Sequence, residues 1–288
     1  MSVRPSVRRF VAPAALAIAA ACGDGTGPAP DPAQRQSQRF SALADSLTRA
    51  GQPDGARAMR AIAELIRLSG RVTTVSVAID GEARSFNALA VQLRVAAETC
   101  EGDPGCVTVA PEFSQVLFAW RGESLDEAVV IAADTVGALT FGVPGPIFVE
   151  GPGDGTSGDP FDGPLPVLHT LGAYGESASE RLWATTGGTL SNGAAVEGAT
   201  CPAADPEVVP ADVAYDCARS DFTFAVDATL HELPVREGSI PSTQPRTLVI
   251  AAQPVAGLAI TLNGPAGALA ARQLLRLVAV GGGWTGGR

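Results

Sequence analysis

The chain has 288 residues, with 20 basic and 30 acidic side chains and a net charge of −10. All 20 of these basic side chains are arginines, and the chain has two histidines besides, so a Walker-type phosphate loop and a Schiff base on a lysine amine are both excluded. The acidic balance disfavours phosphate backbones and anionic lipid surfaces, and we expect no nucleic acid among the partners.

The first 22 residues have the layout of an export signal. Three arginines precede the apolar run 11–21, which is too short to cross a bilayer as a helix. Three alanines then lead directly to Cys22. This order resembles the lipobox of bacterial lipoproteins, although Ala19 stands where leucine is commoner.

The resemblance implies that residues 1–21 form a signal peptide and that Cys22 is lipidated as the mature N-terminus. The alternative is an ordinary signal peptide, with Cys22 left as an unpaired thiol. The lipoprotein interpretation predicts an exported protein fastened to a membrane of the cell envelope. In a Gram-negative cell that location is the outer membrane or the periplasmic face.

Residues 22–33 are rich in Gly, Pro and Asp and are predicted to be a solvated tether. Apolar residues then recur at helical spacing through 34–70, interrupted by Gly51 and Pro53. This pattern predicts a short helical hairpin, each helix with a narrow apolar stripe that packs on the rest of the chain. The stripes are Phe40, Leu43, Ala44 and Leu47, followed by Met59, Ile62, Leu65 and Ile66.

The period changes to two in the segment 71–149, which is predicted to be a β-rich unit. Apolar residues alternate up to Ile79 and again over 89–95, and Asp80-Gly81 between them predicts a β-hairpin with one buried face. Further strand candidates are 107–109, 116–120, 128–133 and 138–143. Trp120 lies inside one of these apolar runs and is expected to pack in the core.

The segment 150–166 is dense in glycine and proline and is predicted to be a long loop or linker. It contains a G-x-G-x-x-G match, but proline follows where a dinucleotide site needs a helix, so no cofactor is expected. The carboxylates of Asp154, Asp159 and Asp162 are weak candidates for a Ca²⁺ site, because the alternating ligand spacing of a calcium loop is absent. A solvated acidic loop explains them better.

Residues 167–288 are predicted to be a second β-rich unit, either separate or part of one domain with 71–149. Asn192-Gly193 indicates a hairpin turn, and apolar residues alternate cleanly over 222–230 and 258–262. Many strands without long helical patterns between them favour antiparallel sheets. The expected fold is mainly β (α+β), sandwich-like, with the helical hairpin at its N-terminus.

Four cysteines remain after Cys22, and an even number in an exported chain predicts disulfides. Local pairing favours Cys100–Cys106, across a turn-forming Asp-Pro-Gly, and Cys201–Cys217. A zinc site is disfavoured, because no pair has the spacing of two to four residues usual for structural zinc.

Catalytic patterns are weak along the whole chain. His231 begins an apparent zinc-protease motif that lacks its second histidine, and Ser177 and Ser179 near His169 lack the nucleophile-elbow pattern. A pair of carboxylates for glycoside hydrolysis remains an open alternative. We therefore expect a non-enzymatic binding or structural module whose partner is an envelope protein or a small ligand. A cell-envelope hydrolase is the alternative.

Overall fold

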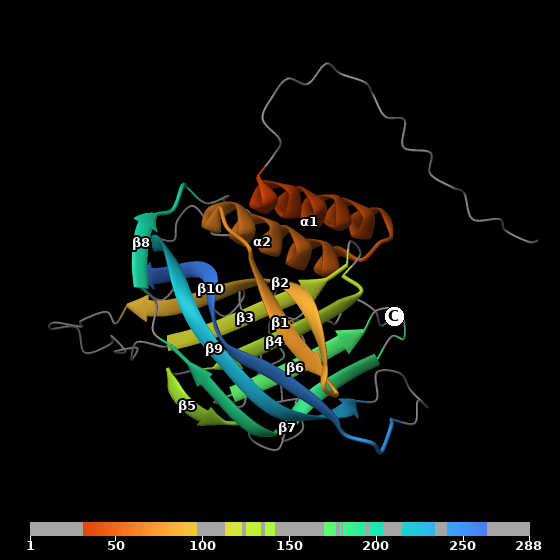
Figure 1. Ribbon diagram of the computed structural model, residues 1–288. Helices are drawn as coiled ribbons and strands as arrows, with labels where there is room; N and C mark the ends of the chain where they lie inside the picture. The colour runs from red at the N-terminus through yellow and green to blue at the C-terminus, as the bar shows by residue number, and fades with distance from the viewer. Residues whose placement is uncertain are drawn as a thin grey trace, which may run out of the picture. The chain divides into compact units, whose positions relative to one another are not determined.

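A computed structural model describes residues 31–96, 113–122, 125–133, 136–141, 170–176, 179, 181–193, 196–203, 215–233 and 241–263 (Figure 1). Two helices come first within these residues, and ten strands follow. The helices are α1 (Pro32–Arg49) and α2 (Pro53–Ser69). The strands are β1 (Thr73–Ile79), β2 (Glu82–Ala96), β3 (Phe113–Arg121), β4 (Glu127–Ala133), β5 (Gly137–Thr140), β6 (Thr170–Glu176), β7 (Arg181–Asn192), β8 (Val196–Thr200), β9 (Tyr215–Leu233) and β10 (Arg246–Asn263).

The predicted helical hairpin is confirmed, and its boundaries follow local chemistry. The Asp31 carboxylate caps α1 by accepting a hydrogen bond from the Ala33 amide at 3.1 Å. Gly51, with φ of +74°, and Pro53 at the start of α2 separate the helices. Gly70 ends α2 in the left-handed conformation, with φ of +63°.

Helix α2 is buried on more sides than the narrow predicted stripe allows. Met59, Ile62 and Leu65 are at most 1% exposed, and so are Ala56 and Leu68, which lie about 60° beyond the two edges of the stripe. The reason is that α1 packs along one side of α2 while the sheet lies beneath both (Figure 1).

The mainly β, antiparallel fold is confirmed, and the ten described strands form one large sheet. Its order is β5-β7-β6-β4-β3-β2-β1-β10-β9-β8, and two further pairings, β7 with β9 and β2 with β10, close the sheet on itself. All the described pairings are antiparallel except that of β2 with β10. Strands from 71–149 and from 167–288 therefore share one sheet.

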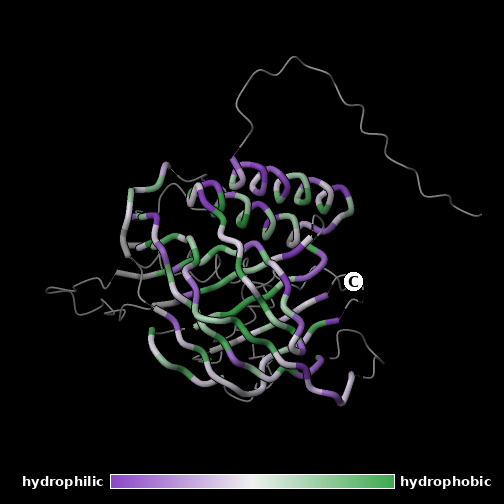
Figure 2. The backbone as a smooth tube through the Cα atoms, viewed as in Figure 1, coloured by the Kyte–Doolittle hydropathy of each residue, from purple (hydrophilic) through white to green (hydrophobic). Residues whose placement is uncertain are grey.

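Two apolar clusters lie on the two sides of this sheet. The inner cluster fills the closed sheet, whose opposite walls pack face to face through residues such as Phe86, Phe222 and Phe224. The outer cluster joins the sheet to the helices, where Phe40 of α1 meets the stacked rings of Phe118 and Trp120. Trp120 is 1% exposed, which confirms its core placement. The strands beneath the helices are correspondingly apolar (Figure 2).

The hairpin at Asp80-Gly81 is confirmed, but its single buried face is wrong for β2. Both turn residues have positive φ, +53° and +79°, as a two-residue hairpin turn requires. The β2 strand presents Phe86 and its alternate neighbours to the interior and Leu89 and its alternate neighbours to the helices. Both faces are buried because the helices cover the outer one.

The hairpin turn predicted at Asn192-Gly193 is wrong. Strands β7 and β8 pair with successive stretches of β9 in the same direction, Asn192 opposite Phe224 and Val196 opposite Asp221. The Gly193 amide still donates to the Thr223 carbonyl at 2.7 Å, so the chain stays beside β9 through this point. An Asn-Gly pair tolerates the irregular backbone of a strand interruption as well as that of a turn.

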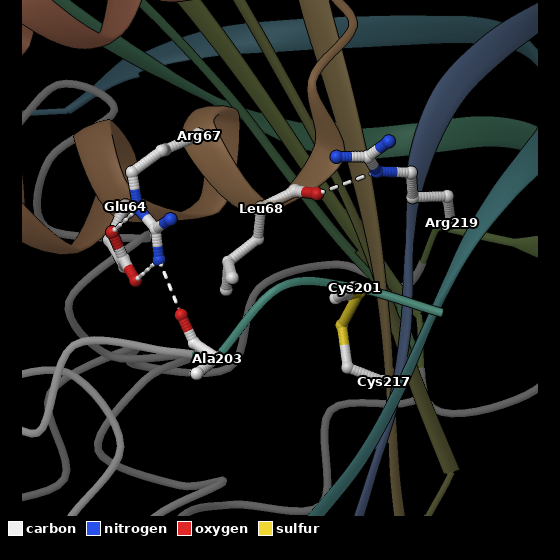
Figure 3. Close-up of a disulfide and its surroundings, with 7 residues drawn as sticks. All are labelled: Glu64, Arg67, Leu68, Cys201, Ala203, Cys217 and Arg219. Atoms are coloured by element: carbon white, nitrogen blue, oxygen red, sulfur yellow. Dashed lines mark hydrogen bonds and ion pairs between the residues drawn. A yellow bond between two sulfur atoms is a disulfide. The ribbon is translucent and has the colours of Figure 1, made fainter. Parts of the chain in front are cut away.

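The end of α2 is fastened to the sheet beside a disulfide (Figure 3). Arg219 of β9 donates to the carbonyl of Leu68 at 3.0 Å, which satisfies one of the last carbonyls of the helix. Arg67 binds Glu64 through two hydrogen bonds and donates to the Ala203 carbonyl at 2.6 Å. These contacts hold the helical layer to β9 and to the segment after β8.

Candidate functional site

Ionisable side chains gather at one end of the closed sheet, where β1, β3, β6 and β9 end and the strands that follow them begin. Except for Asp80 in the β1–β2 turn, these side chains lie on the inward-facing side of their strands. Arg84 is two residues from inward-facing Phe86, and Arg246 is two residues from Leu248. We call this group the charged ring. Its members are Asp80, Glu82, Arg84, Arg121, Glu127, Glu176, Arg181, Glu232 and Arg246.

Arg246 is the centre of one half of the charged ring. Its Nε lies 2.7 Å from Asp80 Oδ2, and its Nη1 lies 2.7 Å from Glu176 Oε1. The guanidinium carbon also lies 4.7 Å from the centre of the Trp183 ring and 5.3 Å from that of Tyr174. Two carboxylates and two aromatic faces thus hold one cation, which ties β10 to the β1–β2 turn and to β6.

Arg84 is the centre of the other half. It bridges Glu127 and Glu82, with both N···O distances 2.6 Å, and Arg121 binds the second oxygen of Glu127 at 3.2 Å. Arg181 and Glu232 form a further pair at 3.6 Å. Each arginine of the charged ring is therefore paired with a carboxylate of the same ring.

Two carboxylates of the charged ring, Glu176 and Asp80, are held ionised. Burial of Glu176 opposes ionisation, but hydrogen bonds from Arg246, Tyr174 and Ser179 outweigh it and lower its pKa. Burial of Asp80 is likewise outweighed, by hydrogen bonds from the Thr247 amide and Arg246, and its pKa is also lowered. Glu176 and Asp80 thus stay charged beside Arg246 and are not tuned to act as acids near neutral pH.

Tyr174, like Ser179, places its hydroxyl against this network, where a nucleophile could lie. It donates to Glu176 Oε1 at 2.8 Å and stacks on Trp183, with ring centres 5.3 Å apart. Burial and the bond to Glu176 raise the pKa of Tyr174, so its hydroxyl stays protonated. With the residue 0% exposed, Tyr174 serves as a hydrogen-bond donor that orients Glu176.

Amide side chains gather further along the interior, away from the charged ring. The Asn192 amide donates to Gln115 Oε1 at 2.8 Å, and Gln115 donates to the Gly193 carbonyl at 3.1 Å. Since β3 and β7 are not neighbours in the sheet, this bond crosses the interior. Within the part of the chain that the structure describes, neither amide atom of Gln92 has a hydrogen-bond partner, and nor does the Ser220 hydroxyl.

A hollow lies on the outer face of β5, β7, β9 and β10. Small side chains such as Ala138, Thr189 and Ala251 line it, and Asp227 is the one ionisable residue among those described around it. A binding site normally combines an apolar hollow with several converging polar groups. This hollow lacks that convergence, so the charged ring remains the stronger candidate.

The structure places only some of the residues that the sequence singled out. Cys201 and Cys217 form the predicted disulfide, with Cα atoms 5.4 Å apart. His231 lies on the exposed outer face of β9, where its Nδ1 is 2.7 Å from the Thr186 hydroxyl. Ser179 donates to Glu176 at 3.0 Å. Outside the described residues lie Cys22, Cys100, Cys106, Asp154, Asp159, Asp162, His169 and Ser177.

The described ranges contain no group of three or more His, Cys, Asp or Glu side chains arranged to hold a metal ion. The same ranges contain no helix with the length and apolar character needed to span a bilayer.

Sequence reasoning missed the charged ring altogether. The signal was the inward alternation itself, which runs past the apolar residues into Arg84, Glu127 and Arg246. Charged residues on the inward-facing side of a strand indicate the open end of a closed sheet only if the sheet is known to close. Closure depends on the pairing of β7 with β9, which are not consecutive strands in the sequence.

Comparison with the profiles of known protein families, with curated proteins and with solved structures gives no match for this chain.

Proposed function

We propose that this chain is a lipid-anchored protein of the cell envelope that carries a non-enzymatic binding or structural module. On this proposal residues 1–21 direct export, Cys22 carries the lipid, and residues 22–33 form a tether to the folded part. The anchor rests on the lipobox-like sequence, and the module on the closed sheet.

One observation carries the non-enzymatic part of the proposal. Nine of the described ionisable groups converge in the charged ring, where each arginine is paired with a carboxylate. An active site needs a nucleophile, an acid or a base that is open to substrate and suitably tuned. The Tyr174 hydroxyl, which lies against the ring, is buried and holds its proton.

The disulfide supports export. Cys201 and Cys217 are linked, and stable disulfides form in oxidising compartments outside the cytosol. The closed sheet supports a structural or binding role, because its packed interior forms a rigid body on which loops can be displayed.

Metabolic labelling tests the anchor. We expect labelled palmitate to be incorporated into the wild-type chain in a bacterial host and lost in Cys22→Ala. The matched control is Thr26→Ala, which changes the same segment and should keep the label. Label retained in Cys22→Ala would mean that the lipid is attached at another residue, and would contradict the anchor at Cys22.

An activity screen tests the module. Purified wild-type protein and Glu176→Gln, which disturbs the charged ring, are assayed with chromogenic ester, phosphate and glycoside substrates. We expect both proteins to give the rate of the buffer alone. A wild-type rate well above buffer that falls at least tenfold in a folded Glu176→Gln protein would instead support the hydrolase alternative.

A further inference from the structure

Charge is distributed unequally between the helical layer and the rest of the chain. Residues 31–72 contain seven arginines and four carboxylates, whereas residues 73–288 contain ten arginines and twenty-five carboxylates. The two helices are therefore the net positive part of an otherwise strongly acidic protein. Such asymmetry favours a defined orientation in an electric field or at a charged surface.

The outer face of α1 carries three of these seven arginines, with the exposed carboxylate of Asp45 at its edge. At about 100° per residue, Arg35, Arg39 and Arg49 fall within an arc of about 80°. All three are exposed, whereas Phe40 and Ala44 on the opposite side are buried in the outer cluster. We call these three residues the arginine face. The excess of seven arginines over four carboxylates in residues 31–72 includes every carboxylate of that segment. One of these carboxylates is Asp45, which lies 3.9 Å from Arg60.

The proposed anchor keeps this face near a membrane. Eight residues separate Cys22 from Asp31, where the cap of α1 begins. Fully extended, that connection spans at most about 30 Å. A short tether raises the effective concentration of the face at the bilayer, so that weak charge attraction becomes sufficient for docking.

We propose that the arginine face of α1 docks on anionic phospholipid headgroups of the bilayer that holds the lipid of Cys22. This inference rests on the proposed function, because the anchor supplies the proximity. Basic residues at a membrane surface are attracted by its negative potential, whereas the acidic closed sheet is repelled by the same surface. Both effects turn the helical layer toward the membrane and the sheet away from it.

The orientation of the helices is transmitted to the sheet. The bond from Arg219 to the Leu68 carbonyl and the bond from Arg67 to the Ala203 carbonyl fix α2 beside the disulfide (Figure 3). The outer apolar cluster holds α1 to the same body. Docking of α1 therefore sets how the folded part stands on the membrane.

Arginine footprinting tests the docking on the full lipidated chain. The protein is reconstituted into vesicles of phosphatidylcholine alone or with about a third phosphatidylglycerol, and phenylglyoxal modification is mapped by mass spectrometry. We expect Arg35, Arg39 and Arg49 to react at least about fivefold more slowly on the anionic vesicles. High salt should remove this protection by screening. Arg181, exposed in the charged ring, is the internal control and should react equally on both.

Two variants use Arg49 as the reporter. Arg35→Gln/Arg39→Gln should lose the protection of Arg49, and Arg35→Lys/Arg39→Lys should keep it, because the charge is retained. Equal reaction of the wild-type face on both vesicles, with a lipidated N-terminal peptide in the mass spectrum, would overturn the docking alone. An N-terminal peptide without lipid would overturn the anchor and the docking with it.

Discussion

Gln92 of β2 and Gln115 of β3 lie directly opposite each other in register, and both are 0% exposed. Gln115 bonds to Asn192 and to the Gly193 carbonyl, whereas Gln92 has no hydrogen-bond partner within the described part of the chain. Two identical side chains in neighbouring positions thus have opposite energetic effects. A buried amide without partners has lost its hydrogen bonds to water without gaining others, which lowers the free energy of unfolding.

This contrast predicts substitutions of opposite sign. Gln92→Leu should raise the free energy of unfolding by about 1–3 kcal/mol, because an unsatisfied amide is replaced by an apolar group of similar size. Gln115→Leu should lower it by a similar amount, because it leaves Asn192 without its bond across the interior. Urea unfolding of both variants measures the difference. A loss of stability in Gln92→Leu would mean that its amide has a partner, such as a buried water molecule.

Stability should fall in acid through the carboxylates bound to Arg246. The pKa values of Glu176 and Asp80 are lowered in the folded chain, so both groups favour folding while ionised. Their contribution is complete above the ordinary carboxyl range, near pH 4, and is lost as the pH falls through the lowered values. We expect Glu176→Gln to cost about 1–3 kcal/mol at pH 7 and less at pH 3.

Urea unfolding of the wild type and of Glu176→Gln at the two pH values checks this prediction. The matched control is Asp227→Asn on the exposed outer face of β9, which removes the same charge and should keep the wild-type dependence on pH. An equal cost of Glu176→Gln at pH 7 and pH 3 would show that the loss does not come from the charge.

We expect a second loss of stability at alkaline pH, caused by ionisation of Tyr174. Burial and its bond to Glu176 raise its pKa, so the folded chain keeps this proton after the unfolded chain has released it. The stabilisation is complete below the ordinary tyrosine value near pH 10 and is lost as the pH rises above it. Tyr174→Phe should flatten this alkaline fall. Absorbance titration near 295 nm should show one of the two tyrosines ionising late in the wild type, and a normal titration of both would be inconsistent with the buried bond.

Local signals in the sequence were sufficient where neighbouring residues decide the structure. Gly51 and Pro53 predicted the break between the helices, and Asp80-Gly81 predicted the turn whose two positive φ values the structure contains. The clean alternation over 222–230 predicted a strand, and β9 covers this segment with Phe222, Phe224 and Leu230 in the inner cluster. In each case a steric preference of the backbone or the side-chain period is enough.

The same signals failed where distant strands decide the structure. Asn192-Gly193 fits a turn, but β9 holds both flanking strands in line, and Asn192 then points its amide across the interior to Gln115. The charged ring had no local signature either. Arg246 and Glu176 are separated by 70 residues, and they meet only because the sheet closes.

The disulfide should contribute measurably to stability. Cys201→Ala/Cys217→Ala should lower the free energy of unfolding by about 3 kcal/mol, because the bond closes a loop between residues separated by 16 positions. Cys100→Ala/Cys106→Ala should cost less, about 2 kcal/mol, if the shorter predicted loop forms. Peptide mapping without reduction identifies both links. A thiol on Cys100 or Cys106 would contradict that second pairing.

Gly257 lies where β10 pairs with β9 on one side and with β2 on the other. We expect its substitution to lower the free energy of unfolding strongly. In register it stands opposite Ser220 on one side and Ala90 on the other. A Cβ added there would collide with the carbonyl oxygen of Ala90 and with the ring of Phe222. The carbonyl belongs to the backbone of β2 and cannot rotate away, so the two strands must separate. Gly257→Ala should therefore cost more than about 3 kcal/mol.

The matched control for Gly257 is Gly81 in the β1–β2 turn. A Cβ at Gly81 meets no atom within 4 Å, so Gly81→Ala is opposed only by its φ of +79° and should cost about 1 kcal/mol. Urea unfolding followed by tryptophan fluorescence measures both variants. A cost for Gly257→Ala no greater than that for Gly81→Ala would mean that β2 and β10 do not approach closely, and the closure of the sheet at this pairing would have to be abandoned.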